Sequence, residues 1–154
     1  MTALLLASAA HLSWQAWQAD TVYAADPCNP YVYAQTSNDM FRLVNRVEDL
    51  AAVDPRGYKL LVKVMAPDGD YWPLPWYLRQ FEQTGWWDHV PDDPFAPIML
   101  VSAKFHAALD DKKTHLMVGY FQLRPQLFFE LYVQMDLWQE WLAHHPKIMS
   151  TSAE

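Results

Sequence analysis

Several residue types are scarce in this sequence, and each shortage removes a class of function. Its single cysteine, Cys28, excludes an internal disulfide and any metal site built from several cysteines. With four glycines, it holds no Gly-rich phosphate-binding loop and no G-x-S-x-G nucleophile turn. No basic run is longer than Lys112-Lys113, and 18 acidic residues outnumber 11 basic ones. The sequence therefore predicts no nucleic-acid partner.

Apolar and aromatic side chains are abundant instead. Hydrophobic residues make up 52 % of 154 residues, which is enough for the core of one compact domain. Eight tryptophans, eight tyrosines and seven phenylalanines are a heavy aromatic load. Such rings bury large areas, and they also line sugar-binding and membrane-interface surfaces where one ring edge stays in water.

No group of side chains has the spacing of a catalytic or metal centre. The carboxylate pairs Asp92-Asp93 and Asp110-Asp111 are neighbours in sequence and rarely face one cavity, so we interpret them as solvated turns. The histidines show neither H-x-x-x-H nor H-E-x-x-H spacing. We therefore predict no catalytic residue, no metal site and no cofactor in this chain.

Residues 1–20 begin with an apolar run, residues 3–10, that is shorter than the roughly 20 apolar residues of a spanning helix. A signal peptide cleaved near residues 23–25 is one interpretation, but no basic residue precedes the run. An amphipathic helix docked on its own domain is another. We favour the outer end of a truncated transmembrane helix, with Trp14 and Trp17 at the headgroup level. Residues 21–30 then form a hinge.

We predict that residues 31–146 form a soluble α/β domain with a mixed β-sheet and helices on both of its faces. Residues 147–154 are predicted to be a disordered tail. The last two strands form an antiparallel hairpin with a loop over 122–126. Hydrophobic periodicity and turn residues place strands at 31–34, 58–65, 85–87, 97–101, 115–121 and 127–133, and helices at 37–51, 74–83, 103–109 and 136–143.

One segment, from Asp68 to Arg79, combines the side chains of a sugar-binding site. It follows a predicted central strand, and in open α/β sheets ligands bind beyond the carboxyl ends of strands. Carboxylates accept hydrogen bonds from sugar hydroxyls while aromatic rings cover the apolar C–H face, and such mixtures are typical of small-molecule sites. The candidate residues are Asp68, Asp70, Trp72, Trp76, Tyr77 and Arg79. The alternative is structural: Asp70 caps a helix and the tryptophans pack in the core or in an interface.

Three segments together resemble a known membrane family. They are residues 29–37 (NPYVYAQTS), residues 70–79 (DYWPLPWYLR), and Leu123-Arg124-Pro125 followed by Asp136-Leu137-Trp138. The chain resembles the C-terminal extracytoplasmic region of the flippase-activity-associated proteins, which are similar to the dolichyl-phosphate-mannose protein mannosyltransferases of the GT-C class. Where that family usually has a basic residue before the Asn-Pro pair, this chain has Cys28.

The resemblance implies a polytopic membrane glycosyltransferase that transfers or helps export polyprenyl-linked glycans, with its catalytic residues outside this chain. It implies a membrane location, an extracytoplasmic domain, a lipid-linked glycan as ligand, and a flippase as a possible partner. It adds Arg124 to the candidate binding residues, and the start at Met1 suggests a fragment or a misplaced gene start. The alternative is a protein-interaction module that docks a partner through Trp86, Trp87, Trp138 and Trp141.

Overall fold

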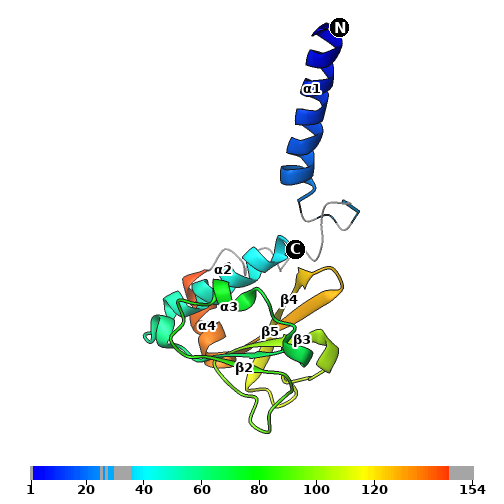
Figure 1. The fold of residues 1–154 in the computed structure, drawn as a ribbon. Coiled ribbons are helices and arrows are strands. Elements are labelled where there is room, and N and C mark those ends of the chain that lie inside the picture. Colours follow the sequence, from blue (N-terminus) through cyan, green and yellow to red (C-terminus); the bar gives the residue numbers. More distant parts are fainter. Residues whose placement is uncertain (1, 25, 27, 30–35, 146–154) are drawn as a thin grey trace, which may run out of the picture.

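The structure is a computed structural model that describes residues 2–24, 26, 28–29 and 36–145 (Figure 1). The strand predicted at 31–34 and the tail predicted at 147–154 lie outside the described residues, and the hinge predicted at 21–30 is described only in part. The strands are β1 (Val62–Met65), β2 (Thr84–Trp87), β3 (Ile98–Ser102), β4 (His115–Arg124) and β5 (Leu127–Gln134). The α-helices are α1 (Thr2–Trp17), α2 (Asp39–Val53), α3 (Leu74–Tyr77) and α4 (Met135–His144).

The strands form one five-stranded sheet in the order β2-β1-β3-β5-β4. β1 is parallel to β2 and to β3, whereas β5 is antiparallel to both β3 and β4. β1, β2, β3 and β4 therefore run in one direction and β5 in the other. The predicted mixed α/β sheet is confirmed.

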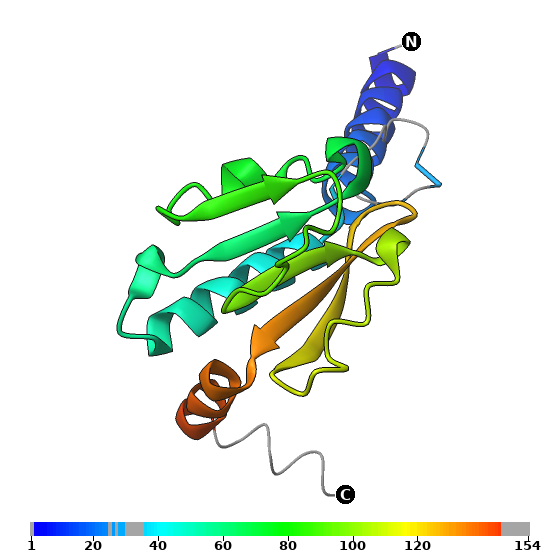
Figure 2. The same ribbon diagram turned by 90° about the horizontal axis from the view of Figure 1, so that it is seen from below.

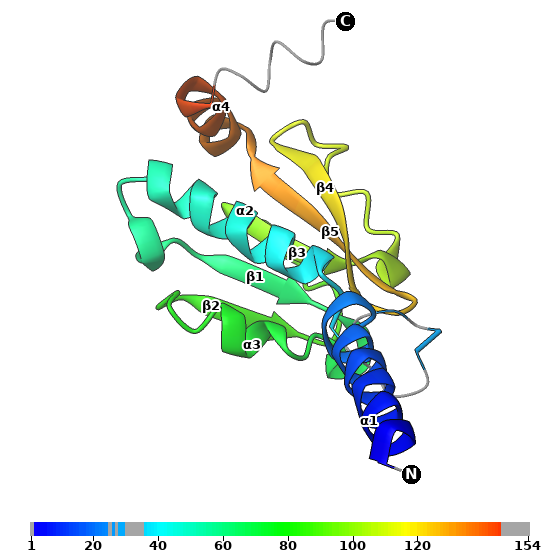
Figure 3. The same ribbon diagram turned by 90° about the horizontal axis from the view of Figure 1, so that it is seen from above.

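All three α-helices of residues 36–145 pack on the same face of this sheet (Figure 3). Residues of α2, α3 and α4 join one buried cluster with the inward side chains of the strands. The opposite face, toward the viewer in Figure 2, is covered by the segments around Phe95, Phe105 and Leu109, outside any α-helix. The prediction of helices on both faces was therefore wrong. His106 and Ala108 adopt left-handed backbone conformations, which stop a helix after the short 3₁₀ turn Ala103–Phe105.

The helix α2 forms where its apolar periodicity predicts one. Its buried positions repeat at helical spacing, and they are Met40, Leu43, Val44, Val47, Leu50 and Ala51. At its start the Ser37 hydroxyl accepts a hydrogen bond from the Asp39 N–H at 3.3 Å. Just after its end, Asp54 accepts hydrogen bonds from Arg56, which lower the pKa of that carboxyl below its ordinary value. Each fully buried leucine stabilises the fold by about 2 kcal/mol.

Three shorter predictions were corrected by long-range pairing and by turns. The helix predicted at 74–83 ends at Tyr77, because the Glu82 N–H donates to the Tyr58 carbonyl at 2.9 Å and holds the chain beside the start of β1. The strand predicted from residue 58 begins at Val62, since Gly57–Lys59 is a 3₁₀ turn. The hairpin loop is shorter than predicted, because Arg124 already pairs with Leu127.

The N-terminal helix α1 continues into the π-helix Gln18–Val22, and none of its residues is buried. In Figure 1 it stands clear of the sheet. The interpretation as an amphipathic helix docked on its own domain is therefore wrong for the described residues. No helix in the described part of the chain combines the length and the apolar character that crossing a membrane requires.

Candidate functional site

The topology gathers the predicted site residues at one edge of the sheet. Because β1 to β4 run in one direction, their carboxyl ends meet at the same edge, where Figure 3 also shows the turn between β4 and β5. Chain segments that follow β1 and β3 and the end of β4 all arrive there. We call this surface the carboxyl edge and define it by Asp70, Trp72, Trp76, Arg79, Lys104 and Arg124.

The centre of the carboxyl edge is a charged network around Asp70. The Nη2 group of Arg124 donates a hydrogen bond to Asp70 Oδ1, although the two residues are 54 positions apart in sequence. The Lys104 ammonium donates to Asp70 Oδ2 at 3.4 Å. Asp70 and Arg124 are both partly buried, with side chains 32 % and 24 % exposed. Two cations thus share one carboxylate in a position that water and a ligand can reach.

The chain reverses sharply between β1 and Asp70. Asp68 and Gly69 adopt φ angles of 57° and 68°, in the left-handed region that glycine enters at no steric cost and aspartate more readily than most residues. This turn brings the Asp70 carboxylate back over the end of the sheet. Asp68 itself is exposed and joins no ion pair among the described residues, so the structure does not place it in the network.

Two tryptophans of the carboxyl edge are exposed, with Trp72 at 62 % and Trp76 at 60 %. The Arg79 guanidinium lies over the Trp76 ring at 4.6 Å from its centroid and donates to the Trp76 carbonyl at 2.7 Å. One face of the Trp76 ring is therefore covered by a cation. Of the structural alternative, packing of these tryptophans in the core is wrong, whereas packing in an interface stays a prediction.

The Tyr77 side chain does not join the exposed tryptophans of the carboxyl edge. Its ring meets the ring of Phe41 on α2 edge to face, with 5.7 Å between the centroids, and the Tyr77 ring packs against the core. Phe41 is 49 % exposed and extends the aromatic surface from α3 onto α2. Tyr77 thus acts as a link between two elements, and its contact with a ligand stays a prediction.

Sequence reasoning missed Lys104 and Phe41. Lys104 follows β3 directly, as Asp70 follows β1, and the same rule about the carboxyl ends of strands could have found it. Phe41 lies on the first turn of α2 beside buried Met40, but outside the stripe of buried positions that the periodicity predicts. Its contact with the Tyr77 ring depends on how α2 and α3 pack, which the sequence pattern does not reveal.

The four rings predicted as a docking surface are not exposed. Trp141 is 2 % exposed, and Trp86, Trp87 and Trp138 are partly buried against the core clusters. Trp138 and Trp141 stack with centroids 4.8 Å apart, and the Arg46 guanidinium covers the Trp141 ring at 4.4 Å. Burial lowers the pKa of Arg46. These contacts stabilise the packing of α4 on α2.

Two further titratable groups with shifted pKa values, His115 and Tyr132, lie on the sheet face that carries no α-helix. His115 is buried, its Nε2 lies 3.1 Å from the Ala96 carbonyl oxygen, and desolvation lowers its pKa. Burial and the hydrogen bond to Glu130 raise the pKa of Tyr132. Among the described residues no three His, Cys, Asp or Glu side chains are close enough to hold a metal ion together.

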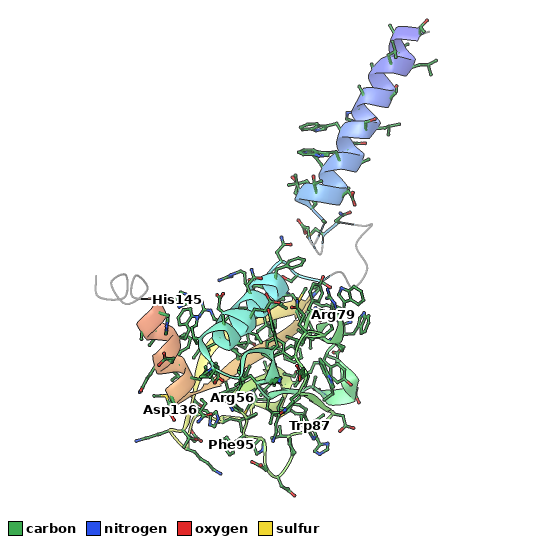
Figure 4. All side chains as sticks on the ribbon, turned by 90° about the vertical axis from the view of Figure 1, so that its left-hand side faces the viewer. Arg56, Arg79, Trp87, Phe95, Asp136 and His145 are labelled. Carbon is green, nitrogen blue, oxygen red and sulfur yellow. The ribbon has the colours of Figure 1, made fainter. Side chains whose placement is uncertain are left out.

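A cavity of about 290 Å³ lies away from the carboxyl edge, between the end of α2 and the start of α4. Its lining includes the carboxylates Asp54, Asp136 and Glu140 and the guanidinium of Arg56. Figure 4 shows Arg79 on the side of the domain nearer α1, whereas Trp87 and Phe95 lie on the far side. Trp87 and Phe95 pack in the cluster on the face of the sheet that carries no α-helix.

Comparisons with known proteins add no relative: no family model, no curated protein and no solved structure matches this chain.

Proposed function

We propose that residues 36–145 are the extracytoplasmic, non-catalytic domain of a membrane glycosyltransferase-like protein, and that its carboxyl edge binds a polyprenyl-linked glycan. The observation that carries this proposal is the exposure of Trp72 and Trp76 beside the Asp70–Arg124–Lys104 network. Exposed aromatic rings around a few fixed polar groups are the usual composition of a small-molecule site.

In this proposal the aromatic rings and the charged groups of the carboxyl edge bind different parts of the glycan. The open face of Trp72 and the uncovered face of Trp76 offer apolar platforms for the C–H face of a sugar. Asp70 accepts hydrogen bonds from sugar hydroxyls, and the two cations that it already binds fix the direction of its oxygens. Arg79 has further N–H donors for hydroxyl or phosphate oxygens. In this proposal the chain holds the glycan, and catalytic groups lie elsewhere in the larger protein.

The same proposal treats α1 as the outer end of a transmembrane segment of that larger protein. Its exposed leucines, Leu4, Leu5, Leu6 and Leu12, have no apolar partner on the domain. The rings of Trp14 and Trp17 lie near its end with centroids 5.2 Å apart, and such amphipathic rings favour the headgroup layer. Leaving such a helix in water costs free energy that a bilayer would recover.

The test is a titration of the full chain in detergent micelles with short water-soluble oligosaccharides and then with a polyprenyl-phosphate-linked glycan. Amide chemical shifts are expected to change for residues 70–79 and for Lys104 and Arg124. The variants Trp72→Ala and Trp76→Ala are each expected to weaken binding about tenfold, because each removes one ring platform.

The matched control is Tyr58→Ala, which removes an exposed aromatic ring that precedes β1 and so lies at the other end of the sheet. It should bind the glycan as well as the unaltered chain does. The proposal fails if no glycan shifts the amides of the carboxyl edge, or if Tyr58→Ala weakens binding as much as Trp76→Ala.

A protein partner such as a flippase remains the alternative function. The exposed rings of the carboxyl edge, and not the four rings predicted from sequence, would then be its contact surface. The titration separates the two functions, because a docking surface has no reason to bind a free oligosaccharide.

A further inference from the structure

We infer that the carboxyl edge lies against the bilayer surface, with Trp72 and Trp76 in the lipid headgroup layer. The partner of this surface is therefore a lipid bilayer, and the orientation of the domain is fixed by it. The inference rests on the proposed membrane attachment through α1, but it does not depend on glycan binding.

The first support is the point at which the N-terminal segment joins the domain. The Ser37 N–H donates to the Leu123 carbonyl at 2.9 Å, and the Asp39 carboxylate accepts from the Gln122 N–H at 3.4 Å. Both contacts attach the start of α2 to the end of β4, next to Arg124. The chain that arrives from α1 thus enters the domain at the carboxyl edge.

The second support is the short length of chain between the N-terminal helix and the domain. The Asn29 side-chain amide donates to the carbonyls of Ala19 and Tyr23, at 3.1 Å and 3.0 Å, and so holds residue 29 at the end of the N-terminal helix. Residues 30–36 then separate this end from the domain, and they span at most about 25 Å. A bilayer around α1 would consequently hold the carboxyl edge within a short distance of its surface.

The third support is the character of the surface itself. Trp72, Trp76 and Phe41 are exposed rings, and tryptophan favours the headgroup layer because its apolar body and its N–H prefer different surroundings. The cations Arg79, Lys104 and Arg124 lie among them, together with carboxylates that include Asp39, Asp70 and Asp88. Such cations attract the anionic headgroups of a bilayer.

The experiment uses the full, isotope-labelled chain in nanodiscs of phosphatidylcholine with a fraction of phosphatidylglycerol and a nitroxide on the lipid headgroup. We expect strong paramagnetic broadening of the amides of residues 71–79 and of the turn between β4 and β5. Amides of Gly57 and Tyr58 at the other end should be broadened several-fold less. The double variant Trp72→Ala and Trp76→Ala should lose most of the broadening at Tyr77 to Arg79.

A control separates this inference from the membrane attachment. The amides of α1 report insertion independently, through their protection from hydrogen exchange in the nanodisc. If α1 is protected and residues 71–79 are broadened no more than Gly57, the orientation is wrong while the attachment stands. If α1 is unprotected and the chain leaves the nanodisc, both are wrong. Loss of glycan binding in micelles affects neither result.

Discussion

The helices α1 and α2 have nearly the same length, 16 and 15 residues, but they have opposite relations to the rest of the chain. α2 buries six side chains along one stripe and leaves polar residues such as Arg42 and Asn45 in solvent. α1 is apolar over much of its circumference and buries none of its side chains. The α2 pattern matches the surface of a sheet, whereas the α1 pattern matches no surface that the described residues offer.

The difference teaches how to interpret an apolar segment. A stripe with a period of 3.6 residues specifies where a helix packs within its own domain. An apolar segment without a stripe leaves the packing partner unspecified, and the exposure of its leucines and tryptophans to water costs free energy. The predictions below test this contrast, beginning with the largest expected effect.

Truncation of the leucines should separate the two helices most clearly. Leu43→Ala on α2 removes a fully buried side chain and should lower the free energy of unfolding by about 2–5 kcal/mol. Leu5→Ala on α1 should change it by less than about 0.5 kcal/mol, because Leu5 has no partner in the domain. Urea denaturation followed by tryptophan fluorescence measures both. Equal effects of the two variants would show that α1 packs on the domain.

The second prediction concerns an edge strand of the packed domain. A methyl group at Gly85 on β2 would lie 2.1 Å from a ring carbon of Trp87, so Gly85→Ala must displace that ring. The cost of such overpacking is about 1–3 kcal/mol. Thermal unfolding of Gly85→Ala against a matched glycine variant without such a neighbour, Gly57→Asn, measures the effect. No loss of stability in Gly85→Ala would mean that the Trp87 ring does not cover this strand.

The charged network of the carboxyl edge should contribute less. Asp70→Asn keeps the shape of the side chain but weakens its hydrogen bonds to Arg124 and Lys104. Because these groups are partly exposed to water, the expected loss of stability is about 1 kcal/mol. Chemical denaturation gives the value, and the amide shifts of Lys104 and Arg124 should move with it. Unchanged shifts at both cations would contradict the network.

The buried histidine gives a prediction about pH. The pKa of His115 is lowered below its ordinary 6.5 in the folded domain, so the unfolded chain binds the proton more readily. The stability that depends on a neutral His115 is complete above pH 6.5 and decreases as the pH falls from there toward the lowered folded-state pKa. Denaturation curves over this range should show the decrease, and His115→Gln should remove it. An unaltered slope in His115→Gln would assign the pH dependence to another group.

The smallest expected effect on stability belongs to the exposed ring Trp76. Trp76→Ala should change the free energy of unfolding by less than about 0.5 kcal/mol, because the ring is exposed and its contact with Arg79 lies at the surface. The same variant should nevertheless weaken glycan binding and bilayer contact. Thermal unfolding checks the first statement, and a large loss of stability would show that this ring serves packing instead of binding.

Local patterns predicted the elements whose cause is local. The buried stripe of α2 and the apolar runs of β1 and β3 gave these elements from the sequence alone. α3 was predicted too long, because its end depends on the pairing of Glu82 with Tyr58, which no helical pattern reveals. Helices were predicted on both faces of the sheet. The left-handed conformations of His106 and Ala108 prevent an α-helix after β3, and hydrophobic periodicity does not reveal them.

The candidate site divides in the same way. The segment from Asp70 to Arg79 was found from its composition, since carboxylates and rings lie close together in sequence. Its charged partners come from other strands, and their contact with Asp70 depends on the order β2-β1-β3-β5-β4. Arg124 was included only through a resemblance, and Lys104 was missed. Long-range ion pairs of this kind require the topology first.

The central claim is that α1 finds its apolar partner in a bilayer while residues 36–145 stay in water. Flotation of the full chain with phospholipid vesicles through a density gradient tests it most directly. The unaltered chain should float with the vesicles, and the double variant Leu5→Lys and Leu6→Lys, which places two charges in the apolar run, should stay at the bottom. If the unaltered chain remains at the bottom as a monomer, with α1 protected from hydrogen exchange in water, the account is wrong.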